Sequence, residues 1–203
     1  MDKKPSIAIL ILAAGESSRM GDQTKQILAW KDSTLLGTAV DQANASIASH
    51  TYVVLGAKEE VIKAEVNLES STVIQNAQWR NGLGSSIASG VAYLMSKVTT
   101  PDALLIMLAD QPLIDTNYLN KMMGNWIGNP SKIITTQYKN HSGVPAIFGN
   151  EYFEELQKLN QDFGAKDIIA ANDAAILALD PDGKEIDIDS WEAYEELVKK
   201  RRI

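Results

Sequence analysis

Two segments of this chain, Ile7–Leu12 and Leu104–Leu108, are apolar at every position instead of alternating between apolar and polar side chains. This pattern is typical of strands in a parallel sheet, where helices cover both faces and bury every side chain. Each segment is followed by a loop and then by a helix-like pattern. The two segments therefore predict an α/β fold, a Rossmann-like, doubly wound and mostly parallel open sheet.

Other apolar runs of strand length, bounded by turn residues, alternate with helix-like segments over roughly the first 130 residues. The expected strands are 6–13, 51–55, 72–75, 103–108, 132–136, 144–148 and 174–179, and the expected helices are 35–48, 58–67, 85–98, 116–126, 151–157, 165–171 and 191–200. No repeat, linker or low-complexity segment divides the 203 residues. We therefore expect a single domain over residues 1–203.

Composition excludes several classes of protein. Nineteen Lys and Arg against 26 Asp and Glu give a net charge of −7, which argues against binding to nucleic-acid phosphates. With no Cys and two His, neither a disulfide framework nor a zinc site is expected. The apolar run from Ile7 to Ala14 is too short to cross a bilayer. We expect a cytoplasmic protein with no membrane partner.

The loop after the first apolar strand combines small residues with two cations. Ala13, Ala14 and Gly15 let the backbone approach a ligand closely, and successive N–H groups there can face an anion. Arg19 and Lys25 add positive charge to the same loop. In an acidic protein this arrangement favours a phosphate site. The alternative is an ordinary turn with surface cations.

Two well-known phosphate motifs do not fit this loop. A Walker A loop requires a glycine five positions after Gly15, and Met20 stands there. Ser17 replaces the second glycine of the dinucleotide-binding pattern. The loop is therefore neither a P-loop nor a dinucleotide fingerprint, and hydride transfer is disfavoured.

A carboxylate, Asp110, follows the strand that ends at Leu108. Mg²⁺ is typically held by one or two carboxylates together with substrate phosphates, so Asp110 facing Arg19 and Lys25 would complete a metal–triphosphate site. The alternative is that Asp110 caps the following helix.

A third loop, 76–86, is rich in amides and glycines and includes Asn76, Gly82 and Ser85. Amide side chains can read the edges of a nucleobase, whereas Ser85 or Ser86 could instead cap the following helix. The two roles are compatible, because the N–H groups at a helix start are free to bind a ligand.

Together these residues resemble a known signature. Leu12-Ala-Ala-Gly15-x-Ser17-x-Arg19-Met20-Gly21, followed by Lys25, is similar to the motif of nucleotidyltransferases that activate sugars and cofactors. Further segments resemble the molybdenum-cofactor nucleotidyltransferases (MobA-like NTP transferases), especially their cytidylyltransferase branch. These segments are Asn76…Trp79…Gly82…Ser86…Gly90, Ala109-Asp-Gln-Pro112, Gly143-Val-Pro145, Asp162-Phe-Gly164-Ala165 and Asp187-Ile-Asp189-Ser190.

The resemblance implies transfer of a nucleoside monophosphate from an NTP to the phosphate of a molybdopterin-type cofactor, with release of pyrophosphate. It implies that Arg19 and Lys25 neutralise the nucleotide phosphates and that Asp110 binds Mg²⁺. Asp187 or Asp189 would be a second metal ligand, and the spacing to Trp191 favours Asp189. Leu12, Ala13, Ala14, Gly15, Lys25, Asn76, Gly82 and Ser85 would bind the nucleotide, and Gly143, Pro145, Gly164 and Ala165 would bind the acceptor.

Substrate choice follows from details of the same resemblance. The Leu12-Ala-Ala-Gly15 sequence resembles the CTP-using branch, although relatives that use UTP also carry it. Val144 stands where the family often has the His of Gly-His-Pro, so the acceptor remains open. A transferase acting on a sugar or polyol phosphate and a non-catalytic cofactor carrier are the alternatives. A molybdoenzyme or its chaperone is a further possible partner.

Overall fold

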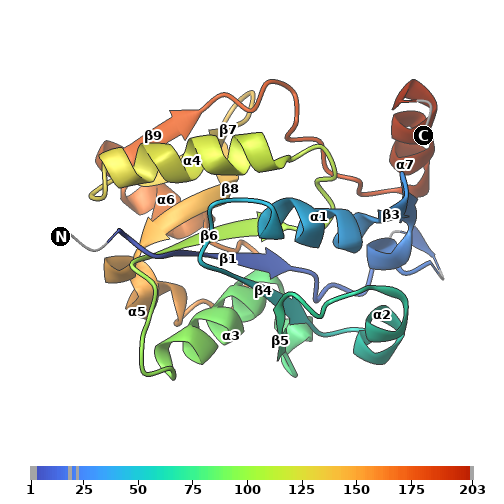
Figure 1. The fold of residues 1–203 in the computed structure, drawn as a ribbon, viewed down its shortest axis with the longest axis horizontal. Coiled ribbons are helices and arrows are strands. Elements are labelled where there is room, and N and C mark those ends of the chain that lie inside the picture. Colours follow the sequence, from blue (N-terminus) through green and yellow to red (C-terminus); the bar gives the residue numbers. More distant parts are fainter. Residues whose placement is uncertain (1–3, 18–19, 22, 202–203) are drawn as a thin grey trace.

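The computed structural model describes residues 4–17, 20–21 and 23–201. Its centre is a seven-stranded sheet in the order β5-β4-β1-β6-β8-β7-β9 (Figure 1). Neighbouring strands run parallel except where β8 meets β6 and β7. The mostly parallel open sheet is confirmed. The strands are β1 (Ile7–Leu12), β4 (His50–Leu55), β5 (Thr72–Gln75), β6 (Ala103–Leu108), β7 (Ile133–Gln137), β8 (Ser142–Gly149) and β9 (Ile176–Leu179).

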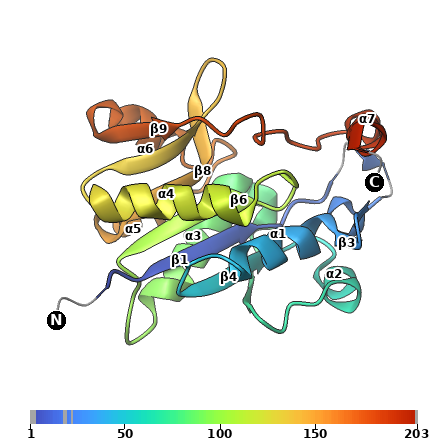
Figure 2. The same cartoon turned by 45° about the horizontal axis from the view of Figure 1, so that its top comes forward.

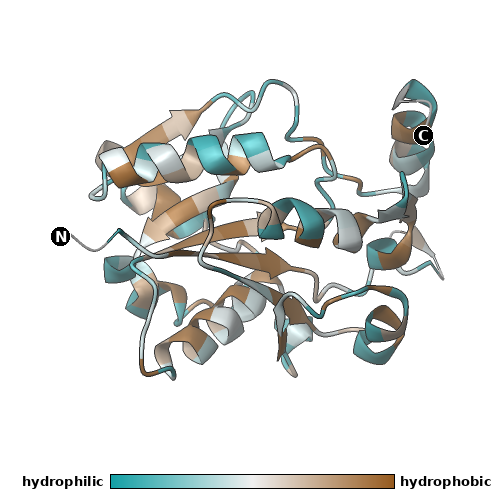
Figure 3. Ribbon diagram, in the orientation of Figure 1, coloured by the Kyte–Doolittle hydropathy of each residue, from teal (hydrophilic) through white to brown (hydrophobic). Residues whose placement is uncertain are grey.

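Helices cover both faces of the sheet (Figures 1 and 2). Alternate side chains of β1 enter two separate cores: Ile9 packs with the helices of one face and Leu10 with those of the other. This double burial explains why the strand has no polar position, and Figure 3 shows it apolar along its length. One face carries α1 (Leu35–Asn44), α2 (Glu59–Glu65) and α4 (Thr116–Gly128), and the other α3 (Leu83–Met95), α5 (Phe153–Leu156) and α6 (Lys166–Ala171).

A third, smaller core joins the two ends of the chain. The short strands β2 (Ala29–Trp30) and β3 (Ser33–Thr34) pair antiparallel, and the last helix, α7 (Trp191–Arg201), packs beside them, away from the main sheet (Figure 1). Trp30 is fully buried there. This packing brings the segment before α7 close to the loop that follows β1.

Most elements lie within a few residues of their expected positions, with two differences. The hairpin β2–β3 was not expected, because strands of two residues are too short to show a periodic pattern. Residues 151–157 form only a 3-10 turn (Asn150–Tyr152) and the single turn of α5. No helix in the described part of the chain is long and apolar enough to cross a membrane.

The order of the strands determines where a ligand site can form. From β1 the chain moves outward to β4 and β5, then returns to place β6 on the opposite side of β1. Connections after β1 and β6 therefore diverge, and in open α/β sheets ligands bind in the crevice that such a divergence leaves at the carboxyl ends of the strands.

Candidate active site

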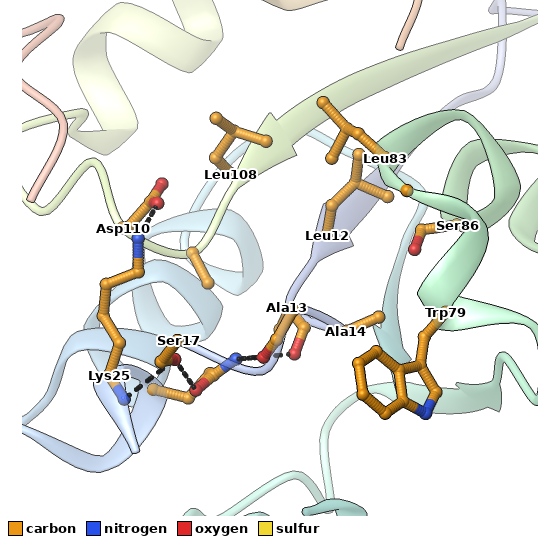
Figure 4. Close-up of a pocket in the computed structure, with 14 residues that line it drawn as sticks. Leu12, Ala13, Ala14, Ser17, Lys25, Trp79, Leu83, Ser86, Leu108 and Asp110 are labelled. Carbon is orange, nitrogen blue, oxygen red and sulfur yellow. Dashed lines mark hydrogen bonds and ion pairs between the residues drawn. The ribbon is translucent and has the colours of Figure 1, made fainter. Parts of the chain in front are cut away.

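A cavity of about 280 Å³ lies at the carboxyl ends of β1 and β6. Lys25 and Asp110 lie at one end of it, and Trp79, Leu83 and Ser86 at the other, with the residues that end β1 between them (Figure 4). One end of the cavity is thus charged, and the other has mainly aromatic and aliphatic walls.

The backbone after β1 is held open toward this cavity. The amide of Gln26 donates to the carbonyl oxygens of Ala13 and Gly15, each at 2.9 Å. Ala14 is held from the other side, since its carbonyl accepts from Ala57 N at 3.0 Å. Leu12, Ala13, Ala14 and Gly15, which are expected to bind the nucleotide, all line the cavity. Gln26 is a site residue that the sequence did not indicate.

Lys25 begins a 3-10 turn, Lys25–Ile27, and its backbone N–H donates to Ser17 Oγ at 3.2 Å. This contact aims the lysine side chain across the cavity, where Nζ meets Asp110 Oδ2 at 2.5 Å and Asp189 Oδ1 at 3.5 Å. The expected pairing of Lys25 with Asp110 is therefore present. Arg19, the second expected cation, lies outside the described residues.

Asp110 does not cap a helix. The N-cap of α4 is Asp115, whose carboxylate accepts from Tyr118 N at 2.9 Å. One Asp110 oxygen contacts Lys25, while the other, Oδ1, is buried and has no hydrogen-bond partner in the described structure. The capping alternative is wrong, and the carboxylate has a free oxygen.

The C-terminal carboxylates reach the same place through the backbone. Ile188 N donates to the carbonyl oxygen of Asp110 at 3.0 Å, so Asp187 and Asp189 flank a residue fixed to the end of β6. Desolvation, followed by the negative charges of Asp110 and Asp189, raises the pKa of Asp187 from 3.8 to about 6. Hydrogen bonding to Gln111 and the charge of Lys25 act in the opposite direction.

These carboxylates fit a divalent cation that also contacts a substrate. In the described part of the chain no three His, Asp or Glu side chains form a complete metal site. Mg²⁺, however, usually takes one or two carboxylates and completes its shell with water and substrate phosphates. The unpartnered Asp110 Oδ1 and the Asp189 carboxylate, both beside Lys25, provide such a partial set.

Comparison with known proteins identifies the family. The model of the MobA-like NTP transferase domain matches residues 9–176, which include the cavity walls and Asp110. The chain belongs to this family.

Relatives of this MobA-like transferase carry different names. The nicotine blue oxidoreductase of Paenarthrobacter nicotinovorans is 28% identical over 134 residues, which cover 66% of this chain and 63% of the relative. Purine catabolism protein PucB of Bacillus subtilis is 28% identical over 205 residues, covering 95% and 96%. The crystal structure of Rv0371c from Mycobacterium tuberculosis matches with a TM-score of 0.82 at 25% identity, covering 97% and 100%. A structure of Rv0371c with manganese gives a TM-score of 0.76 at 25% identity, covering 96% and 98%.

Two of the expected nucleotide-binding residues of this MobA-like transferase support the cavity wall from behind. Asn76 is buried, and its amide donates to Ser85 Oγ at 2.9 Å and to Ser86 Oγ at 3.1 Å. Ser85 Oγ in turn donates to the carbonyl oxygens of Gln78 and Gly82. Neither Asn76 nor Ser85 lines the cavity, whereas Gly82 and Ser86 do.

The start of α3 also differs from its expected form. The helix begins at Leu83, and its N-cap is Gly82 in a positive-φ conformation, without a side-chain cap. Ser85 and Ser86 lie inside the first turn, so the expectation that one of them caps the helix is wrong. Gly82 is required here, because a Cβ would come within 2.8 Å of Asp162 Cα.

The four residues expected to bind the acceptor do not line the cavity. Gly143 and Pro145 lie in β8, and Ala165 is the N-cap of α6. Gly164, with φ of 57°, packs against Leu83, which is a cavity wall. The structure thus brings Gly164 next to the cavity from outside, and Gly143 and Pro145 lie on a separate strand.

A hydrogen-bonded chain connects β8 to the carboxylates. Gln111, which is 1% exposed, donates from Nε2 to Tyr138 OH at 2.6 Å and to Asp187 Oδ1 at 2.8 Å. Tyr138 OH donates to the carbonyl oxygen of Val144. Burial, followed by the charge of Asp187, raises the pKa of Tyr138, so this hydroxyl keeps its proton. The sequence did not indicate this chain.

Proposed function

We propose that this protein is a Mg²⁺-dependent cytidylyltransferase that transfers CMP from CTP to the phosphate of a molybdopterin-type cofactor and releases pyrophosphate. The observation that carries this proposal is the meeting of Lys25 and Asp110 at one end of a cavity that begins at the carboxyl end of β1. A cation for phosphates and a carboxylate with a free oxygen lie side by side, as a metal-assisted transfer of a phosphoryl group requires.

The cavity suits a small base with its ribose. Its volume of about 280 Å³ is close to the lower end of the usual range for ligand pockets, about 300 to 1,000 Å³. Trp79, Leu83 and Ser86 lie at the end away from Lys25, where the base would bind with the triphosphate directed toward the lysine. The small side chains of Ala13 and Ala14 leave room along the β1 loop.

The residues present can perform the transfer by positioning and charge. An acceptor phosphate oxygen attacks the α-phosphorus of CTP in line; a new P–O bond forms as the bond to the β-phosphate oxygen breaks, and pyrophosphate leaves. Lys25 would bind the departing phosphates, and Asp110 with Asp189 would hold Mg²⁺, which when bound neutralises phosphate charge. Because positioning and charge are sufficient, no covalent enzyme intermediate is required.

Two other functions share part of this site. A transferase that acts on a sugar or polyol phosphate would use the same donor residues and differ only at the acceptor. A non-catalytic carrier would use Lys25 to bind a phosphorylated cofactor, but it would gain nothing from a carboxylate with a free oxygen in the phosphate site. Asp110 therefore favours a transferase over a carrier.

The direct test measures pyrophosphate released from CTP, GTP, UTP and ATP in the presence of Mg²⁺. Each nucleotide is paired in turn with molybdopterin-type cofactor, a sugar phosphate, a polyol phosphate or no acceptor. Release that requires both CTP and the pterin cofactor, with the CMP adduct seen by mass spectrometry, is the expected result. Release with a sugar phosphate alone would replace the acceptor, and tight cofactor binding without release from any nucleotide would establish the carrier.

A further inference from the structure

The amide of Gln111 has one orientation that its surroundings allow. Ionised Asp187 can only accept a hydrogen bond, so the Gln111 group that faces it must be the NH₂. Tyr138 uses its single proton on the Val144 carbonyl, so toward Gln111 it must accept. Both hydrogens of Nε2 are therefore committed, while Oε1 is buried without a partner in the described structure. A buried amide kept with an unpaired oxygen indicates that its two donated bonds matter.

Two adjacent residues, Asp110 and Gln111, hold the segment 187–189. Asp110 holds Ile188 through the backbone bond at 3.0 Å, and Gln111 holds the side chain of Asp187. This leaves Asp189 next to Lys25. The spacing between Asp110 and the late carboxylates therefore depends on Gln111 as well as on the backbone.

The hydrogen-bonded chain that begins at Asp187 ends at the Val144 carbonyl on β8. The ring of Tyr138 lies beneath Gly143, where a Cβ would be 3.2 Å from Cε2, and it stacks on His141 at a centroid distance of 4.8 Å. The Tyr138 hydroxyl therefore contacts both the segment 143–145, through the Val144 carbonyl, and the amide of Gln111.

We propose that Gln111 is a positioning residue that orients Asp187 beside the divalent-cation site, and that Tyr138 links this orientation to the β8 segment 143–145. The inference rests on the proposed function for the divalent-cation site and for the acceptor. Residues that orient metal-site carboxylates typically change metal affinity when they are replaced. The link predicts that binding of the acceptor at the β8 segment 143–145 changes the affinity for the cation, and that binding of the cation changes the affinity for the acceptor.

Mn²⁺ binding tests this inference without any transfer reaction. The free Mn²⁺ signal is followed by electron paramagnetic resonance during titration of the full-length protein, with and without CTP. Gln111→Leu, which keeps the side-chain bulk and removes both donors, is expected to weaken Mn²⁺ binding about tenfold or more. Tyr138→Phe keeps the ring on Gly143 and is expected to weaken binding by a smaller factor. It is also expected to raise KM for the acceptor more than it changes kcat.

Tyr118→Phe is the matched control. Tyr118 is also buried, and its hydroxyl bonds to Thr136 Oγ1 at 3.0 Å and to the Leu179 carbonyl, whereas no hydrogen bond joins it to Gln111 or Asp187 in the described structure. It should leave Mn²⁺ affinity unchanged. Equal weakening in Tyr118→Phe and Tyr138→Phe, or unchanged affinity in Gln111→Leu, would overturn the inference. A wild-type protein that binds Mn²⁺ but transfers no CMP would instead contradict the proposed function alone.

Discussion

The proposed donor side and the proposed acceptor side of this protein are built differently. On the donor side, the end of β1 and the loop after it supply residues 12–15, Ser17, Lys25 and Gln26, and the loop after the neighbouring strand β6 supplies Asp110. On the acceptor side, the candidates come from β8 and from the start of α6, and none of them lines the cavity. The proposed donor residues thus line one cavity beside the central strands, whereas the proposed acceptor residues on β8 are connected to Asp187 through Tyr138 and Gln111.

The largest expected effect tests the donor side at Lys25. Lys25→Ala should lower kcat for pyrophosphate release by about a hundredfold or more. Removal of a single group that stabilises the charge of the transition state typically lowers kcat by this factor. Thermal unfolding measures any loss of stability separately, because the lysine side chain is 17% exposed and pairs with Asp110. Lys63→Ala, which removes an ion pair with Glu59 between two residues that do not line the cavity, is the control. Near-normal activity of Lys25→Ala would remove the lysine from the mechanism.

Asp110→Asn should have the next largest effect. The amide keeps the shape but loses the charge that attracts a cation, so we expect a fall in kcat of about tenfold to a hundredfold that higher Mg²⁺ or Mn²⁺ partly restores. Activity is measured against metal concentration. Asp115→Asn, in the same loop, keeps its role as an N-cap because Asn caps as well as Asp, and it should retain activity. Equal losses in the two variants would show a general disturbance of the loop.

The meeting of the loop after β1 with Asp110 was predictable from the sequence because each directly follows a strand that is apolar at every position. A strand apolar at every position fixes its own burial in the sheet, and the loop after it must then emerge at the carboxyl edge. Lys25 and Asp110 therefore met as expected, although they are 85 residues apart. Asp110 follows a second strand of the same kind, so the same argument placed it at the same edge.

The remaining contacts depend on packing that no local pattern encodes. Gln111 and Asp187 are 76 residues apart, and a buried glutamine has the same appearance in a sequence as an exposed one. Gly82 fits against Asp162 only because α5 and the loop after it fold back over α3. Likewise, Asn76 is buried against the first turn of α3, which begins at Leu83, two residues before its expected start.

A third prediction separates cavity residues from their supports at the α3 end. Ser86 Oγ accepts from Asn76, and in the described structure it donates to no protein group, so its proton can reach a base carbonyl in the cavity. Ser86→Ala should raise KM for CTP about tenfold with little change in kcat, as expected for loss of one hydrogen bond of about 1.4 kcal/mol.

Ser85→Ala is the paired variant. Its hydroxyl bonds to Gln78 and Gly82 but does not line the cavity, so it should lower the melting temperature more than it changes KM. Steady-state kinetics and thermal unfolding of both variants distinguish the two roles. If Ser85→Ala raised KM for CTP as much as Ser86→Ala, the division between wall and support would be wrong.

The smallest effect concerns the β7–β9 part of the sheet, where Tyr118 of α4 bonds to Thr136 and Leu179. Tyr118→Phe should lower the free energy of unfolding by about 1 kcal/mol at pH 7 through loss of this hydrogen bond. Burial raises the pKa of Tyr118 to about 12 in the folded state, so its neutral form is favoured by folding. This stabilisation is complete below pH 10, the ordinary pKa of tyrosine, and is lost as the pH rises toward 12.

The difference between wild type and Tyr118→Phe in urea unfolding should therefore shrink from pH 10 to pH 12. A constant difference over this range would show that the hydroxyl ionises equally in both states. Donor-side kinetics at pH 7 should be unaffected, because these strands lie on the opposite side of β8 from the cavity.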